Sequence, residues 1–345
     1  MKRRNLMKTV AAAALALGLA PASLSAQEVT LRLHQFLPPP APVPAHILKP
    51  WAAAVEARLD GKLKIEHYDA MSLGGRPNDL IDQAIDGTAD LIMTVVGYTP
   101  GRFPKTEVFE LPFMMTNPVA TAKAFWQLTE AELQNEEYKD VKILGAWVHG
   151  PGMIHSKDPI TSLEDMAGKK LRGPTRVITD MLSELGATPV GMPLPAIPES
   201  LSKGVIDATV IPWEVTTAVR VSELVGNHTE FAGPEALYTA TIILAMNKDR
   251  YESLPDDVRA AIDAESGEKL SAFASQVMWD YDAPARQIAV DRGNTITTLD
   301  EAEVARWKEK AQPVIDRWVA DMETKGIDGR ALIQQAKDLI VKNGG

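Results

Sequence analysis

Seven polar or aromatic residues follow segments whose sequence predicts a β-strand, at the points where those strands end. They are His34, Gln35, Tyr98, His149, Arg172, Trp213 and Glu214. In open α/β sheets, ligands bind beyond the carboxyl ends of the strands. Arg172 is also followed by Gly173-Pro174, which leaves its backbone approachable. The sequence therefore predicts a ligand site at these strand ends.

Four of these residues also have a purely structural interpretation. Arg172 could be a surface cation at a strand edge, and Trp213 could fill the core. Glu214 could cap the following helix, because the positive N-terminal end of a helix favours a carboxylate. His149 could be a hydrogen-bonded structural histidine.

Motifs for catalysis are missing from the sequence. It contains no Gly-x-Ser-x-Gly elbow, no His-Glu-x-x-His, no phosphate loop and no Gly-x-Gly-x-x-Gly. His149 and His155 are six residues apart, which does not match the spacing of a metal-ligand pair on a helix or strand. Cysteine is absent, which excludes disulfides, thiolate metal sites and cysteine nucleophiles. We therefore predict no catalytic residues, no cofactor and no protein-bound metal.

Composition and charge exclude further classes of protein. The chain has 345 residues, of which 45% are hydrophobic and 24% charged, as in globular proteins. That length predicts two domains. The formal charge of −10 argues against nucleic-acid binding, which needs a basic face, and against docking on anionic lipid.

The N-terminus has the order of regions found in secretory signals. Four basic residues between Lys2 and Lys8 precede the apolar run 9–20, which is followed by Pro21 and the small-residue stretch 22–26. Twelve apolar residues are too few to span a membrane as a helix. We therefore expect a signal peptide over residues 1–26, cleaved near Ala26, and export of the mature protein.

The rest of the chain predicts alternating strands and helices. In its first part, strands are expected at 29–36, 63–68, 90–96 and 141–148, and helices at 46–59, 78–85 and 117–134. A second unit begins near Pro159, with strands at 169–172 and 207–211 and helices at 162–167, 177–185 and 198–203. A strand at 238–246 is expected to return to the first sheet, and residues 256–282, 301–325 and 329–342 to be helical. This alternation is typical of α/β sheets with parallel strands.

One pattern occurs in both units. In the first unit, an apolar helix is followed by Gly87, two further residues, Asp90 and an apolar strand. In the second unit, an apolar helix is followed by Gly204, two further residues, Asp207 and an apolar strand. Two lobes that reuse one supersecondary unit would give this pattern. Helix–glycine–strand is also common in any α/β protein, so the sequence leaves both interpretations open.

Several segments, in order along the chain, resemble those of one protein family. They are Gly87-x-x-Asp90, Glu110-Leu111-Pro112-Phe113, the stretch 162–172, Leu185-Gly186-Ala187-Thr188-Pro189-Val190, the stretch 201–207 and Pro212-Trp213-Glu214. This succession resembles the solute-binding proteins of tripartite ATP-independent periplasmic (TRAP) transporters. No single segment is diagnostic, but their order is specific.

The resemblance implies a two-lobed periplasmic binding protein fold. Each lobe would be a mixed sheet flanked by helices, with a long helix spanning both. The expected domains are lobe I over 27–150 and about 236–300, lobe II over 151–235, and C-terminal helices over 301–345 that pack on the lobes. The lobes would close on an organic carboxylate held by Arg172 and deliver it to a small and a large membrane subunit driven by an ion gradient.

Residues near Arg172 narrow the expected ligand. Many family members carry a second basic residue just before the position of Ser156-Lys157, whereas here 149–155 contains no arginine. We therefore expect a monocarboxylate, with Trp213 and Tyr98 as apolar walls, Glu214 or His149 at its other end, and His34 and Gln35 nearby. The alternatives are a binding protein of an ATP-driven importer, or a periplasmic enzyme on a two-lobed scaffold.

Overall fold

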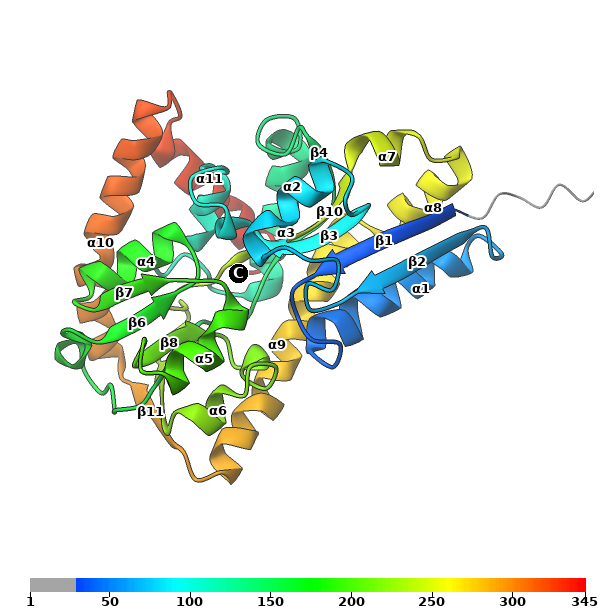
Figure 1. Ribbon diagram of the computed structural model, residues 1–345. Helices are drawn as coiled ribbons and strands as arrows, with labels where there is room; N and C mark the ends of the chain where they lie inside the picture. The colour runs from blue at the N-terminus through cyan, green and yellow to red at the C-terminus, as the bar shows by residue number, and fades with distance from the viewer. Residues whose placement is uncertain (1–28) are drawn as a thin grey trace, which may run out of the picture.

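The computed structural model describes residues 29–345. The predicted signal peptide, residues 1–26, lies outside the described residues. From residue 29 onward the chain forms two β-sheets flanked by helices, which confirms the predicted α/β, two-lobed fold class (Figure 1). Within residues 29–345, no helix is both long enough and apolar enough to cross a membrane.

The first sheet has the strand order β2-β1-β3-β10-β4. Its strands are β1 (Val29–Gln35), β2 (Leu63–Tyr68), β3 (Leu91–Val95), β4 (Val141–Val148) and β10 (Thr241–Asn247). Strand β1 is parallel to β2 and β3, whereas β10 is antiparallel to both β3 and β4. The predicted return of the chain to the first sheet is therefore confirmed.

The second sheet has the order β11-β9-β5-β8-β6-β7. Its strands are β5 (Met153–Ser156), β6 (Lys170–Gly173), β7 (Thr188–Gly191), β8 (Ala208–Ile211), β9 (Asn227–Phe231) and β11 (Thr295–Leu299). Strand β11 pairs with β9 over its whole length. The expectation that lobe I extends to about residue 300 is therefore wrong for residues 295–299, because the preceding helix returns the chain to the second sheet.

Helices cover both sheets. The α-helices are α1 (Lys49–Ala57), α2 (Leu80–Ile85), α3 (Pro118–Leu128), α4 (Arg176–Glu184), α5 (Ile197–Ser202), α6 (Val221–Leu224), α7 (Lys248–Glu252), α8 (Asp256–Glu265), α9 (Glu268–Asp291), α10 (Glu301–Thr324) and α11 (Gly329–Lys342). Short 3₁₀ or π turns include η1 (Val43–Leu48), η3 (Val96–Tyr98), η4 (Thr106–Glu110), η7 (Leu194–Ala196) and η8 (Glu214–Thr216).

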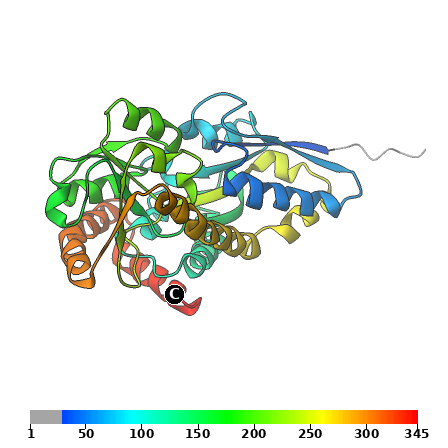
Figure 2. The ribbon, with the colours of Figure 1, turned by 90° about the horizontal axis from the view of Figure 1, so that it is seen from below.

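Helix α9 runs along both lobes, as the long helix was predicted to do (Figure 2). In its first half, the Ser271 hydroxyl accepts a hydrogen bond from Ala146 N–H at 2.9 Å, and the Ser275 hydroxyl donates to Val148 C=O at 2.8 Å. These two serines satisfy backbone groups on the free edge of β4, which would otherwise be buried without partners. Farther along, α9 contacts η8 and β11 of the second lobe.

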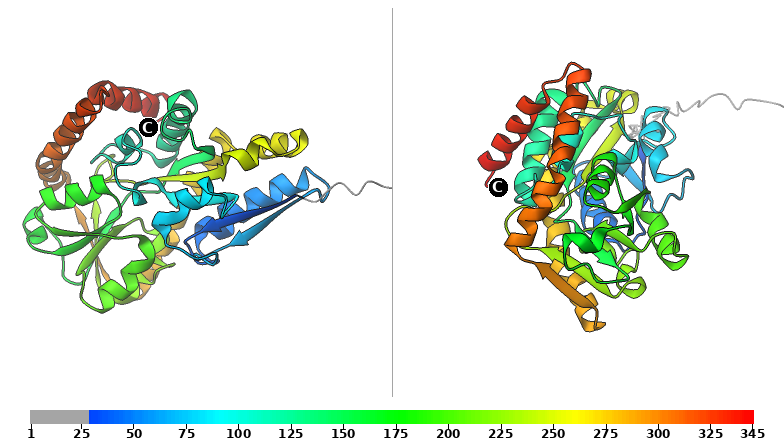
Figure 3. Two further views of the ribbon diagram at one scale, coloured as in Figure 1. Left: turned by 45° about the horizontal axis from the view of Figure 1, so that its top comes forward. Right: turned by 90° about the vertical axis from the view of Figure 1, so that its left-hand side faces the viewer.

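The C-terminal helices form a second connection between the lobes. Helix α10 packs on α4 beside the second sheet, and α11 packs on α3 beside the first. Figure 3 shows α10 and α11 arching along one side of the molecule.

The repeated helix–glycine–strand pattern corresponds to a repeated structural unit. Gly87 and Gly204 both have positive φ, at +78° and +70°, which glycine adopts without strain. Asp90 then accepts a hydrogen bond from Arg32 N–H at 2.8 Å, on the neighbouring parallel strand β1. Asp207 accepts one from Lys170 N–H at 3.2 Å, at the start of the neighbouring parallel strand β6. The two lobes therefore use the same device to set the register of two parallel strands.

Candidate functional site

A buried cavity lies between the two sheets. From the first-sheet side and α9 it is lined by Phe36, Leu37, Val43, Met93, Val95, Tyr98, His149, Tyr238, Ala240, Ile242 and Met278. From the second-sheet side it is lined by Arg172, Pro174, Leu194, Ile211, Pro212, Glu214 and Val215. Four of the seven predicted site residues are therefore brought together here: Tyr98, His149, Arg172 and Glu214.

Arg172 projects from β6 and is 1% exposed. Its Nε donates to Met192 C=O at 2.8 Å, and its Nη1 donates to Val210 C=O at 3.1 Å. Its Nη2 is buried and has no hydrogen-bond partner among the described residues. Burial lowers the pKa of the guanidinium, but arginine stays charged in proteins. The site thus holds a fixed, buried cation whose free N–H groups need an anionic acceptor.

Two phenol groups line the same cavity. The Tyr98 hydroxyl accepts a hydrogen bond from Leu194 N–H at 3.0 Å, which leaves its own proton free to donate. The Tyr238 ring packs on Gly152, where an added Cβ would lie 2.0 Å from a ring carbon. Burial raises the pKa of both phenols, so each keeps its proton and is a donor. Arg172, Tyr98 and Tyr238 can therefore all donate to an anion in the cavity.

Glu214 begins η8, directly after the turn that follows β8, and is 2% exposed. Its Oε2 has no hydrogen-bond partner among the described residues. Its backbone N–H donates to Asp282 Oδ1 on α9 at 2.8 Å. Burial, reinforced by the Asp282 carboxylate, raises the pKa of Glu214 well above its usual range.

His149 contributes a neutral wall rather than a free hydrogen-bonding group. Its Nδ1 lies 2.5 Å from Gly150 C=O, and its Nε2 accepts from Ala240 N–H at 3.0 Å. The proton therefore sits on Nδ1. Burial lowers the pKa of His149 to about 4, so the ring is uncharged near neutral pH.

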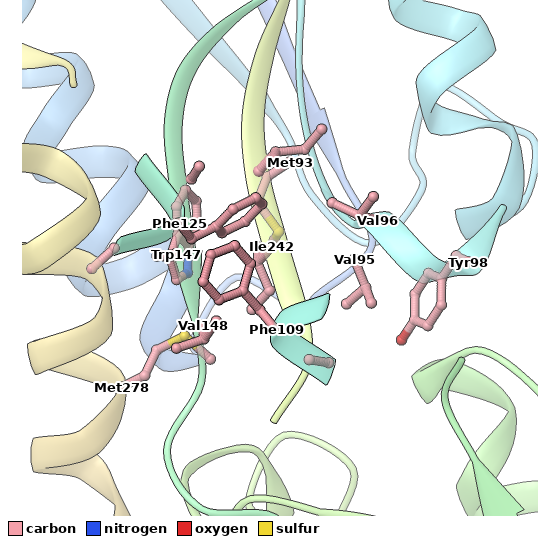
Figure 4. Close-up of a cluster of buried hydrophobic side chains, with 14 of the residues drawn as sticks. Met93, Val95, Val96, Tyr98, Phe109, Phe125, Trp147, Val148, Ile242 and Met278 are labelled. Carbon is pink, nitrogen blue, oxygen red and sulfur yellow. The ribbon is translucent and has the colours of Figure 1, made fainter. Parts of the chain in front are cut away.

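Apolar side chains form the rest of the cavity wall. Figure 4 shows Met93 and Val95 on β3, Ile242 on β10 and Met278 on α9, with the Tyr98 hydroxyl directed toward the second lobe. Methionine sulfur makes favourable contacts with aromatic rings. The wall therefore suits an apolar or aromatic body attached to one anionic group.

His34 and Gln35 do not line the cavity, although they were predicted as site residues. His34 Nδ1 lies 2.7 Å from Gln83 Oε1. Gln35 Nε2 donates to Leu37 C=O and Asp69 Oδ1, both at 2.8 Å. Gln35 thus holds the turn that places its neighbours Phe36 and Leu37 in the wall.

Trp213 also lies outside the cavity, contrary to the prediction. Its ring packs against His155 and His228, with ring centroids 4.9 Å and 4.8 Å away. Its Nε1 donates to Glu230 Oε1 at 2.9 Å. Its neighbours Pro212 and Glu214 line the cavity, whereas Trp213 packs on the second sheet.

Sequence reasoning missed Tyr238 and both cavity methionines. Tyr238 lies just before β10, whereas we considered only residues that follow strands. Because β10 is antiparallel to its neighbours, its beginning meets their carboxyl ends. The predicted return of this strand to the first sheet was the signal that could have found Tyr238.

Other contacts join the lobes beside the cavity. Glu107 on η4 pairs with Arg176 at the start of α4, with Oε1 and Nε 3.0 Å apart. Glu107 Oε2 also accepts from Trp318 Nε1 on α10 at 3.2 Å. Thus η4, α4 and α10 meet at one buried carboxylate.

A second glutamate of η4, Glu110, lies outside the cavity. Its Oε1 accepts from the Thr241 N–H at 2.9 Å, while its Oε2 is buried without a partner among the described residues. Burial raises the pKa of Glu110 to about 7.

Residues 34–321 match the model of the bacterial extracellular solute-binding protein family 7. The chain belongs to this family. It is similar to a TRAP solute-binding protein from Rhodoferax ferrireducens, solved with copurified benzoate, at 48% identity and a TM-score of 0.89, covering 91% of this chain and 98% of that one. It is also similar to a marine metagenome TRAP solute-binding protein specific for aromatic acid ligands, solved with 3-hydroxybenzoate, at 44% identity and a TM-score of 0.90, covering 92% and 100%. A third similar structure, from Bordetella bronchiseptica with bound mandelate, has 28% identity and a TM-score of 0.83, covering 91% and 99%.

These findings confirm the family that the sequence resembled. The protein is a solute-binding protein of the TRAP class, a family that works with the membrane subunits of a transporter. The three similar structures hold small organic acids. The family is extracellular or periplasmic, and its members serve transport.

Proposed function

We propose that this solute-binding protein captures an aromatic monocarboxylate in the cavity between its lobes. The observation that carries the proposal is the buried Arg172 guanidinium, whose Nη2 has no hydrogen-bond partner within residues 29–345. A carboxylate can accept two parallel hydrogen bonds from a guanidinium, which also fixes its orientation. The Tyr98 and Tyr238 hydroxyls are further donors for the same carboxylate.

The balance of charge favours one carboxylate over two. Arg172 is the only cationic side chain among the cavity-lining residues of the described chain, since His149 is neutral. A second carboxylate would meet Glu214 and apolar walls, where burying an unpaired charge is costly. The aromatic character is supported by Phe36, Tyr238 and the two methionines in the wall, and by the aromatic acids bound to the two relatives of 48% and 44% identity.

The protein would release its ligand unchanged. Export would remove residues 1–26, and closure of the two lobes would bury the ligand before delivery to the membrane subunits. Lobe I would comprise residues 27–150 and about 236–294, and lobe II would comprise residues 151–235 together with strand β11 at 295–299. The C-terminal helices, residues 301–345, would pack on both lobes.

Calorimetric titration of the mature protein tests the proposal. The protein is first unfolded and refolded to remove any copurified ligand, then titrated with benzoate, 3-hydroxybenzoate, mandelate and succinate. We expect binding of at least one of the three aromatic acids and none of the dicarboxylate. Chromatography of the released compound should recover the acid that was added. Tight binding of succinate without binding of any aromatic acid would contradict the proposal, and a chemically altered product would favour an enzyme.

A further inference from the structure

Glu214 is a buried carboxyl group that the carboxylate grip does not use. It lines the same cavity as Arg172, yet within residues 29–345 no side chain or backbone group forms a hydrogen bond with its carboxyl oxygens. A polar group buried without a partner loses its hydrogen bonds to water and destabilises the fold, so its retention in an apolar wall calls for a partner. The structure therefore leaves one hydrogen-bonding group of the cavity unaccounted for.

The surroundings of Glu214 keep it protonated. Asp282 on α9 accepts the Glu214 N–H, so a second carboxylate lies close by. Burial, together with the nearby Glu230 carboxylate on β9, raises the pKa of Asp282 to about 7. Glu230 is itself paired with Arg286 of α9, with Oε1 and Nε 2.7 Å apart.

The charged and titratable groups that face the cavity itself give Glu214 no ion pair in the described structure. Arg172 is the cation there, and its hydrogen-bond partners in the described structure are the backbone carbonyls of Met192 and Val210. Tyr98, Tyr238 and His149 are neutral near pH 7 because burial shifts each pKa away from neutrality. At neutral pH the Glu214 carboxyl group therefore offers one O–H donor and one C=O acceptor.

We propose that Glu214 binds a hydroxyl group of the ligand, so that the protein prefers monocarboxylates that also carry a hydroxyl. This inference rests on the proposed function and adds a second recognition point to the same cavity. A hydroxyl group can donate to the carboxyl C=O and accept from its O–H, which satisfies both groups without a net charge. Arg172 thus recognises the carboxylate of the ligand, and Glu214 distinguishes monocarboxylates that carry a hydroxyl group from those that do not.

A ligand ammonium group is the competing partner for Glu214. It would require an ionised Glu214, but no N–H donor in the described structure supports that form, and Asp282 opposes it. Binding of an ammonium group would therefore expel a proton from the site. Binding of a hydroxyl group would leave the number of bound protons unchanged.

The experiment compares benzoate with its three monohydroxy derivatives by calorimetry at pH 7. Wild-type protein should bind one hydroxybenzoate at least about fivefold more tightly than benzoate, the lower end of what leaving a buried polar group unpaired costs. The methionine side chain in Glu214→Met has a similar length but no group that donates or accepts a strong hydrogen bond. In this variant the ratio of hydroxybenzoate affinity to benzoate affinity should fall to near one. Glu214→Gln keeps a donor and an acceptor and should retain most of the ratio. Glu110→Gln is the matched control, a buried glutamate outside the cavity with an unpartnered oxygen, and should leave the ratio unchanged.

Two further readouts separate this inference from the proposed function. Titrations in buffers of different ionisation enthalpy should show no proton release with the hydroxylated acid. A hydroxybenzoate preference that survives in Glu214→Met, or no preference in a wild-type protein that binds benzoate, would overturn the role of Glu214 alone. Preference for an aminobenzoate with proton release would also overturn it. Failure of the wild-type protein to bind any of these acids would instead count against the proposed function.

Discussion

The Tyr98 hydroxyl lies 3.0 Å from the Leu194 backbone nitrogen and accepts its hydrogen bond across the cavity between the two sheets. Tyr98 ends η3, which follows β3 of the first sheet, whereas Leu194 begins η7, after β7 of the second sheet. A single side chain therefore lines the ligand cavity and also joins the two lobes. We expect this contact to couple occupancy of the cavity to the proposed closure of the lobes.

Replacing Tyr98 with phenylalanine should weaken ligand binding without unfolding the protein. The change removes one acceptor for Leu194 and one donor to the ligand, and a hydrogen bond contributes about 0.5–1.5 kcal/mol, or roughly 2- to 12-fold in affinity. Calorimetry with the preferred acid measures the loss. Tyr138→Phe is the control, because Tyr138 is equally buried and its hydroxyl lies 2.7 Å from Thr106 Oγ1, away from the cavity. It should lower stability but not affinity; equal affinity losses in both variants would contradict a specific role for Tyr98.

The Glu107–Arg176 pair should favour the closed form from outside the cavity. Neither residue lines the cavity, so Arg176→Met acts only through the equilibrium between open and closed lobes. Because Arg176 is partly exposed, we expect a modest effect, roughly two- to fivefold weaker ligand binding.

Small-angle scattering gives an independent measure of that equilibrium. Saturating ligand should reduce the radius of gyration of the wild-type protein, and it should do so less completely for Arg176→Met. Arg306→Met removes an exposed pair with Glu164 and serves as the control, with no expected change. An unchanged radius of gyration in the wild-type protein at saturating ligand would rule out closure as the mechanism.

Acid should destabilise the protein through a pair of buried histidines. His155 Nε2 lies 3.1 Å from Ile211 C=O and donates to it, so His155 Nδ1 accepts from His228 Nδ1 at 2.7 Å. Asn294 Nδ2 donates to His228 Nε2 at 2.9 Å. Both rings are therefore neutral, with no room for a further proton on either facing nitrogen.

The sign of the pH effect follows from the shifted pKa values. Burial lowers the pKa of His155 to about 3 and that of His228 to about 4, below the usual value of about 6.5 in an unfolded chain. As the pH falls below about 6.5, the unfolded state therefore binds more protons than the folded state does. The free energy of unfolding, which is largest above that pH, decreases as a result. Removing one titrating histidine should reduce the slope of unfolding free energy against pH by up to about 1.4 kcal/mol per unit. Urea unfolding of wild type and His228→Gln between pH 7 and 4.5 measures this, and parallel slopes would contradict it.

Export should produce a shortened chain. The predicted cleavage after Ala26 leaves Gln27–Gly345, which is 319 residues. Mass spectrometry of the protein from the cell envelope should give that mass to within a few residues. A soluble envelope protein that still begins at Met1 would show that the N-terminal segment is not a cleaved signal peptide.

Local sequence patterns predicted all five strands of the first sheet, and β6 and β8 of the second, because their apolar patterns depend on nearby residues. They missed the short strands β5, β7, β9 and β11 of the second sheet. The pairing of Gly87-x-x-Asp90 with Gly204-x-x-Asp207 even pointed to a repeated unit, which the Asp90 and Asp207 hydrogen bonds bear out. The sheet to which a five-residue strand belongs depends on distant partners. Residues 295–299 were assigned to the wrong lobe for this reason.

The site was predictable only in part. Arg172, Tyr98, His149 and Glu214 reach the cavity because the ends of parallel strands converge at one edge of a sheet. Trp213 does not reach it, since the direction of a side chain just past a strand depends on local turn geometry that composition does not encode. The sequence also does not show which of these side chains already have hydrogen-bond partners. Both ring nitrogens of His149 are hydrogen-bonded, whereas Arg172 and Glu214 each have one atom without a partner in the part of the chain that the structure describes.

Titration of Arg172 variants tests the proposed carboxylate grip most directly. Removing one partner of a buried charge pair costs roughly 2–5 kcal/mol, so Arg172→Ala should bind the preferred aromatic acid at least ~30-fold more weakly than wild type. Arg172→Lys should not restore binding, because an ammonium group cannot make the planar two-point contact. Circular dichroism and urea unfolding establish that both variants fold. Wild-type affinity in a folded Arg172→Ala would contradict the proposal that Arg172 holds the ligand carboxylate.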